Sequence, residues 1–101
     1  SKGDEHLRTL TKKGVTGIHL CGENDLTEIL SFCFSGVEIE LLSVIPENTL
    51  LADCLQNEKP PLPELKSGEL ILLASLEHRA SLAELLNNQG LQKHQHWVLF
   101  S

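Results

Sequence analysis

The residues best suited to chemistry stand in one short segment, Cys21–Asp25, whose sequence is CGEND. An apolar stretch precedes it and an amphipathic pattern follows, which predicts a turn from a strand into a helix N-terminus. Such a terminus favours an anion. A dinucleotide-binding turn needs GxGxxG, however, whereas only Gly22 is present, and Glu23 and Asp25 would repel a phosphate. The segment therefore predicts either a ligand with amine, hydroxyl or cationic groups, or a helix cap formed by Asn24 or Asp25.

Cys21 occupies the position of a phosphocysteine nucleophile, at the end of a strand and before a helix N-terminus. The C-x5-R form of that site needs arginine where Thr27 stands. An acidic loop would also raise the pKa of the thiol rather than lower it. No Ser-His-Asp order, pair of catalytic carboxylates or nucleophile elbow stands out. The sequence thus predicts no catalytic residue, and it favours a non-enzymatic role over an enzymatic one.

The histidines raise the question of a metal. On strands, His94 and His96 would share a face, and so would His19 and Cys21. Neither pair has a third ligand at a recognisable spacing. We therefore predict no metal site and identify no cofactor.

Composition limits the classes of partner. The chain has 101 residues, enough for one domain, and a formal net charge of −6 without a basic stripe, so we expect no direct nucleic-acid contact. There is no apolar run of about 18 residues and no signal peptide, which argues against a membrane. Three widely spaced cysteines fit a reducing, cytoplasmic setting.

Hydrophobic patterning predicts alternating strands and helices. Residues 1–14 read as a lead-in helix or linker, and KPPLPEL (59–65) as an extended passage because its prolines exclude a helix. The expected strands are 15–22, 37–45, 68–75 and 96–101. The expected helices are 26–34, a short one at 47–57, and 76–90. We expect a wide apolar face on the first of these, from Leu26, Ile29, Leu30, Phe32, Cys33 and Phe34. On the last, Leu76, Ala80, Ala83 and Leu86 recur near the helical period, helped by Leu82 and Leu85.

Strands joined by helices are usually parallel, with right-handed crossovers. We therefore predict that residues 15–101 form a small three-layer Rossmann-like α/β fold with a mainly parallel four-stranded sheet in the order 2-1-3-4. Ligands bind such sheets at the carboxyl ends of the strands, where the order reverses. The candidate ligand-binding residues at that edge are Gly22, Glu23, Asn24, Asp25, Ser75 and His78.

Two longer stretches carry a resemblance. GIHLCGENDLTEIL-SFCFSGVEIELLSVIPEN, and KPPLPEL followed by GELILLASLEH, resemble small Rossmann-like domains of nucleotide-sugar-modifying proteins and related regulators. LRTLTKKGV resembles the exit of a winged-helix DNA-binding domain, which some bacterial regulators place before a Rossmann-like sensor domain. Gly22 matches the loop glycine and Ser75 the strand-end position that faces the pocket.

The resemblance implies a non-enzymatic ligand-sensing or dimerisation domain of a bacterial transcription regulator. Its partners would be a small-molecule or nucleotide ligand and a second copy of the chain, and Trp97 would either anchor the dimer or pack against a helix. Two alternatives stay open. One is the nucleotide-binding half of a nucleotide-sugar-modifying enzyme, and the other is a degenerate scaffold without a ligand.

Overall fold

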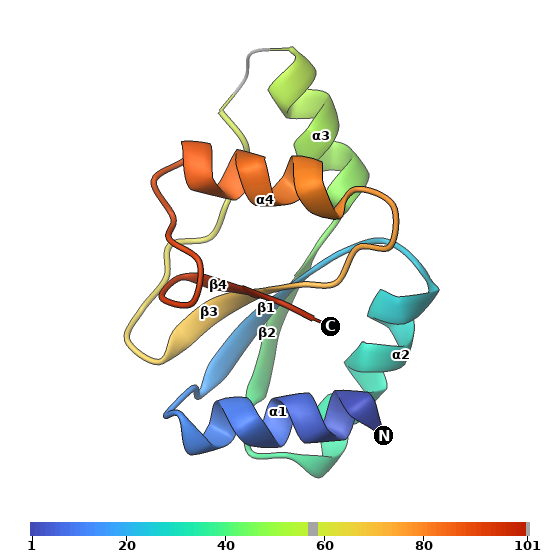
Figure 1. The fold of residues 1–101 in the computed structure, drawn as a ribbon, viewed down its shortest axis with the longest axis vertical. Helices are drawn as coiled ribbons and strands as arrows, with labels where there is room; N and C mark the ends of the chain where they lie inside the picture. Colours follow the sequence, from blue (N-terminus) through green and yellow to red (C-terminus); the bar gives the residue numbers. More distant parts are fainter. Residues whose placement is uncertain (57–58, 101) are drawn as a thin grey trace.

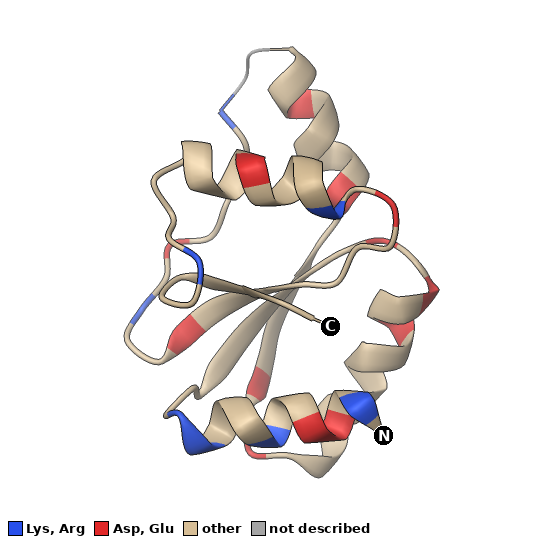
Figure 2. Cartoon of the chain, viewed as in Figure 1, with Lys and Arg blue, Asp and Glu red and all other residues tan. Residues whose placement is uncertain are grey.

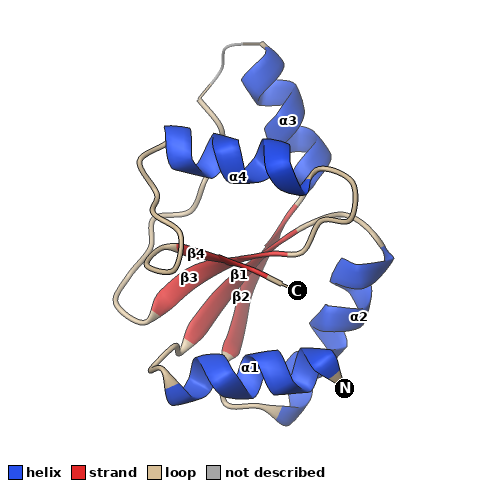
Figure 3. Ribbon diagram, viewed as in Figure 1, coloured by secondary structure: helices blue, strands red, loops and turns tan. Residues whose placement is uncertain are grey.

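The computed structural model describes residues 1–56 and 59–100. Helices and strands alternate along the chain (Figure 3). The elements are α1 (Lys2–Lys12), β1 (Gly17–Cys21), α2 (Asp25–Cys33), η1 (Phe34–Gly36), β2 (Glu40–Ile45), α3 (Glu47–Leu55), β3 (Glu69–Leu73), α4 (Arg79–Asn88) and β4 (Trp97–Leu99). The short helix and the last strand were expected to reach residues 57 and 101, which lie outside the described residues.

The sheet has four parallel strands in the order β2-β1-β3-β4, so the predicted fold class is confirmed (Figure 1). β1 and β3 are central, and β2 and β4 form the two edges. Between Ile18 and His19 the register of β1 on β2 shifts, because β2 carries one extra residue there. This shift places Ser43 opposite His19.

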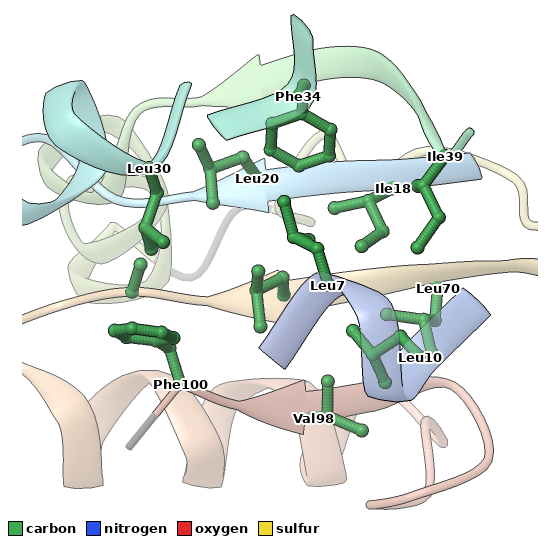
Figure 4. Packing of buried hydrophobic residues seen from close by; sticks show 12 residues of the cluster. Leu7, Leu10, Ile18, Leu20, Leu30, Phe34, Ile39, Leu70, Val98 and Phe100 are labelled. Atoms are coloured by element: carbon green, nitrogen blue, oxygen red, sulfur yellow. The ribbon is translucent and has the colours of Figure 1, made fainter. Parts of the chain in front are cut away.

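Two hydrophobic cores cover the two faces of the sheet, which makes three layers. On one face Leu7 and Leu10 of α1 and Leu30 of α2 pack onto the strands (Figure 4). On the other face the core includes Leu50 of α3 and Leu82 of α4. Burying one such leucine side chain stabilises the fold by about 1.5–3 kcal/mol.

The lead-in segment is a helix, α1, and it packs against the sheet as part of the first hydrophobic core. Its Leu7 and Leu10 are buried, and Ser1 caps its N-terminus by accepting a hydrogen bond from the Asp4 N–H. Trp97 is also buried, and its indole N–H donates to Asn87 of α4 at 3.1 Å. Of the two roles expected for this tryptophan, packing against a helix is therefore the one observed.

The predicted apolar face of α2 is too wide. In α2 only Thr27 and Leu30 are buried, while Ile29 and Phe32 are 62% and 73% exposed. The helix lies on the sheet through a narrow stripe, and these two side chains point away from it. In α4 the buried residues are Leu82, Leu85 and Leu86, all of which the sequence pattern included, whereas Leu76, which precedes the helix, and Ala80 are exposed.

Two predicted boundaries were also wrong. β2 starts at Glu40 rather than at 37, because η1 and the bend after it carry Phe34 and Ile39 into the first core. α4 starts at Arg79 rather than at 76, because the Ser75 side chain accepts the His78 N–H and closes a turn. His94 and His96 do not share a strand face, because both precede β4 and His94 has a φ of 72°.

Candidate functional site

The carboxyl ends of β1, β2 and β3 bring three chain segments to one edge of the sheet (Figure 1). These are the turn that follows Cys21, the junction of β2 with α3 at Pro46, and the turn that starts at Ser75. This is the edge at which the strand order reverses, where the sequence predicted the site.

Glu47, the first residue of α3, occupies the centre of this edge and is only 3% exposed. Its Oε1 accepts hydrogen bonds from the Glu23 N–H at 2.8 Å and from Asn24 Nδ2 at 2.9 Å. Its Oε2 accepts one from the hydroxyl of Ser75 at 2.5 Å. The carboxylate therefore takes the donors with which such an edge would hold a phosphate.

These contacts also set the ionisation of Glu47. Burial acts to raise the pKa of its carboxyl. The hydrogen bonds from Ser75, Asn24 and the Glu23 N–H lower it, and His78 adds a smaller electrostatic effect. Together they outweigh burial, and the pKa lies below its ordinary value of 4.5. Glu47 is thus a carboxylate at neutral pH despite its burial.

Asn24 connects the turn to its surroundings. Its Oδ1 caps α2 by accepting the N–H groups of Leu26 and Thr27, and its Nδ2 also donates to Ala74 O at 3.0 Å. The Thr27 hydroxyl donates to the same carbonyl at 3.0 Å. Of the two caps predicted, the structure has Asn24, and Asp25 is the first helical residue.

The position of Gly22 has no space for a side chain, because Thr27 and the backbone of Ala74 lie close to it. A Cβ at this position would collide with the Thr27 Oγ1 and the carbonyl oxygen of Ala74. The glycine therefore permits a close approach of two loops, which is a different purpose from access of a phosphate to the backbone.

Cys21 is fully buried beside this cluster. Burial, with a smaller effect of the Glu47 carboxylate, raises the pKa of its thiol to about 12. The thiol therefore stays protonated at neutral pH, and it lacks the thiolate character of a nucleophile.

Two hollows flank the buried carboxylate. A groove of about 420 Å³ lies between α2 and the end of β2 and includes Gly22, Glu23 and Asn24 in its lining. A smaller hollow of about 170 Å³ is lined by Glu23, Asn24 and His78, among others. Ser75 is buried under Glu47 rather than exposed to either hollow.

The predicted residues thus separate into three groups. Gly22, Glu23 and Asn24 line the groove, and Asn24 and Glu23 also reach the hollow that His78 borders. Ser75 supports the site from below. Asp25 is exposed at the start of α2 and lines neither space.

The rim of this edge is acidic (Figure 2). Glu23, Asp25, Glu28 and Glu77 are exposed there, and Arg79 is the nearby basic side chain on α4. Four of the eight lysines and arginines belong instead to α1 and the residue after it: Lys2, Arg8, Lys12 and Lys13. The field at the groove therefore favours cationic groups over anionic ones.

Sequence reasoning missed Glu47 as the organising residue. In dinucleotide-binding sheets an acidic residue commonly ends the second strand, whereas here Pro46 stands in that position and Glu47 follows it. The displacement by one residue moves the carboxylate from the strand end to the first turn of α3, where it still points into the edge. An acid directly after a proline at a strand end was the available signal.

Other site types find no support in residues 1–56 and 59–100. No group of three or more potential metal ligands lies close together there. No helix in the same part of the chain is both long and apolar enough to span a bilayer. A scan of protein-family models and searches of curated proteins and of solved structures found no match to this chain.

Proposed function

We propose that this chain is a ligand-sensing domain whose ligand carries an amine or hydroxyl group rather than a diphosphate. One observation supports this most directly: the Glu47 carboxylate already holds the Glu23 N–H, the Asn24 amide and the Ser75 hydroxyl. A phosphate would have to displace a buried carboxylate of like charge. This argues against the nucleotide-binding half of a nucleotide-sugar enzyme. In line with the resemblance, the domain would serve a bacterial transcription regulator in the cytoplasm.

The groove of about 420 Å³ offers the chemistry for such a ligand. Val44 and Pro46 provide apolar surface, and Glu23 and Glu28 provide exposed carboxylates. An amine would pair with these carboxylates while the body of the ligand covers the apolar part.

Glu23 also supplies a route from ligand binding to the rest of the domain. Its Oε1 accepts the N–H of Asn48 at 3.4 Å, which connects the turn to the first turn of α3. A ligand that engages Glu23 would compete for this oxygen and loosen that connection. Ligand binding would thereby shift the position of α3, the response that a sensor needs.

The test is a thermal-shift screen with amines, polyols, nucleosides and the matching nucleotides. A ligand at 100 times its dissociation constant adds about 2.7 kcal/mol, which raises the Tm by at least about 10 °C in a domain of this size. We expect shifts with amines or nucleosides that Glu28→Gln reduces and that Glu84→Gln, on the exposed side of α4, leaves unchanged. A larger shift with a nucleotide than with its nucleoside would contradict the proposal, and no shift with any compound would favour the empty scaffold.

Homodimerisation is a second candidate function, favoured by exposed apolar side chains on α2 and on the edge strand β2. Ile29 and Phe32 of α2 and Val44 of the edge strand β2 are 62%, 73% and 49% exposed. An edge strand also presents backbone groups that a second strand can pair with. Sedimentation of the wild type and of Phe32→Ser would test this: a dimer that Phe32→Ser dissociates supports it, and a monomer at all concentrations contradicts it.

A further inference from the structure

A second polar cluster lies on the face of the sheet that α3 and α4 cover, away from the edge described above. It consists of one side chain from each of three neighbouring strands: His19 of β1, Ser43 of β2 and Glu69 of β3. His19 Nδ1 is 2.7 Å from the Ser43 Oγ, and His19 Nε2 is 3.6 Å from the Glu69 Oε1. The order serine, imidazole, carboxylate is that of an activated hydroxyl nucleophile.

The histidine is held in the orientation that this chemistry needs. His19 is 9% exposed, and its Nε2 is a buried atom without a hydrogen-bond partner among the described residues. The nearby Glu69 carboxylate favours the tautomer that carries its proton on Nε2. Nδ1 is then the acceptor of the Ser43 hydroxyl proton. The distance to Glu69 exceeds a hydrogen bond, as is common for catalytic contacts without a substrate.

The irregular pairing of β1 and β2 creates this arrangement. The extra residue of β2 places Ser43, rather than Leu42, opposite His19. Bulges of this kind often re-aim a side chain beside an active site.

Ser43 is also accessible. It is half-buried and lines a groove of about 360 Å³ between β2 and the proline-rich segment, whose other walls include Leu50, Pro61, Leu62 and Pro63. This largely apolar groove has the volume of a small-molecule site. Its chemistry suits a short hydrocarbon chain.

The edge position of β2 supplies a backbone donor. The carbonyl of Ile45 accepts the Gly22 N–H, so the backbone groups of Ile45 face β1. Because successive residues of a strand direct these groups to opposite sides, those of Val44 face the open edge. The Val44 N–H follows Ser43 directly and is the donor we assign to a developing oxyanion.

We propose that Ser43 is a nucleophile that accepts short apolar acyl groups from esters. The Ser43 oxygen attacks the ester carbonyl carbon while its proton passes to His19 Nδ1, and Glu69 stabilises the imidazolium through Nε2–H. When the tetrahedral intermediate collapses, the bond between the carbonyl carbon and the alkoxy oxygen breaks. The alcohol leaves with the proton from His19, and the acyl group stays on Ser43. Ser43 and His19 are the reacting residues, and Glu69 is a positioning residue.

The experiment uses the intact chain with p-nitrophenyl butyrate and, separately, a fluorophosphonate. We expect stoichiometric p-nitrophenol release and one label per chain, which peptide mapping assigns to Ser43. Ser43→Ala should abolish this label, and His19→Gln should lower the labelling rate about 100-fold, the usual effect of losing a general base. Ser81→Ala, which removes an exposed serine of α4, should change nothing.

Glu69→Gln tests the positioning role without altering the reacting groups. It should slow labelling where His19 is present and leave the rate of the His19→Gln variant unchanged, because Glu69 acts only through the imidazole; a purely structural role would lower both rates. Circular dichroism of each variant separates loss of reactivity from loss of fold. Labelling of Ser43 no faster than of Ser81, or a rate that folded Glu69→Gln and His19→Gln leave unchanged, overturns the proposal. Glu84→Gln, which removes an exposed carboxylate of α4, should not affect labelling.

Discussion

The two buried polar clusters of this domain differ in how completely their hydrogen bonds are made. Around Glu47 both carboxylate oxygens have donors, from two turns that meet at the sheet edge. Around His19 one ring nitrogen contacts Ser43 and the other has no partner among the described residues. A saturated cluster fixes the geometry of its loops, whereas an incomplete one keeps capacity for a proton or a reaction. We therefore infer that the first cluster fixes the shape of the sheet edge and that the second cluster is reactive.

The glycines beside the two clusters, Gly22 and Gly17, also differ in how tightly their surroundings are packed. A Cβ on Gly22 would meet a backbone carbonyl and a hydrogen-bonded threonine, neither of which can move freely. A Cβ on Gly17, near the second cluster, would meet the Leu42 Cδ1 at 2.6 Å, which is the end of a flexible side chain. The first region is thus rigidly packed, and the second can adjust.

The largest expected effect is the loss of Glu47. Glu47→Ala would leave the Ser75 hydroxyl, the Asn24 amide and the Glu23 N–H without their acceptor. Buried unsatisfied groups cost about 1–3 kcal/mol each, and partial relaxation limits the total, so we expect a loss of about 3 kcal/mol in the free energy of unfolding. Urea denaturation at neutral pH measures it.

Glu84→Ala on the exposed side of α4 is the matched control and should stay within about 0.5 kcal/mol of the wild type. Equal stability of Glu47→Ala and Glu84→Ala would show that the saturated cluster does not hold the loops. Glu47→Gln, which keeps an acceptor oxygen but loses the charge, should fall between the two.

The glycine pair gives the next effect in size. Gly22→Ala should destabilise the domain by about 2 kcal/mol, as overpacking of a rigid site does, whereas Gly17→Ala should cost less than about 1 kcal/mol because Leu42 can change rotamer. The same denaturation experiment compares both. A larger loss for Gly17→Ala would reverse the contrast between the two regions.

Sequence patterns were sufficient for the architecture because each strand carried its own signal. The apolar run of β3 is typical of a strand buried on both faces, and Leu70, Ile71, Leu72 and Leu73 are all buried. Helix faces were less predictable. Ile29 and Phe32 fit the helical period of α2, but the period alone does not say how wide a stripe the sheet covers.

Sequence reasoning missed Glu47 in the first polar cluster and the whole of the second cluster for a common physical reason. Glu47 and Glu23 are distant in sequence, as are His19, Ser43 and Glu69, and only the pairing of the strands brings them together. The order of His19 and Ser43 along the chain carries no signal. The position of Ser43 opposite His19 further depends on an irregularity in pairing that no periodicity predicts.

A second buried nitrogen without a hydrogen-bond partner among the described residues lies on α1, and its effect on the pH dependence of stability gives the smallest and most specific test. His6 packs its ring 5.2 Å from that of Phe100, and its Nδ1 has no partner among the described residues. Burial, with a smaller effect of Lys13, lowers the pKa of His6 below its ordinary value of 6.5. The unfolded chain therefore binds a proton at this residue more readily than the folded one, and stability falls as pH drops below 6.5.

Protonation of Glu47 also lowers the stability of the fold, but over a more acidic pH range than protonation of His6. Because its folded pKa lies below the ordinary 4.5, its contribution is complete above that value and is lost as pH falls through the folded pKa. His6→Phe, which keeps a ring against Phe100, should remove only the loss that begins near 6.5, and Glu47→Gln only the loss that begins near 4.5. Urea denaturation across this pH range separates the two. The contrary outcome is that His6→Phe loses as much stability as the wild type between neutral pH and pH 4.5. An unpartnered buried nitrogen then does not make the stability of this fold sensitive to pH. The contrast between saturated and incomplete clusters would in that case rest on Ser43 and His19 alone.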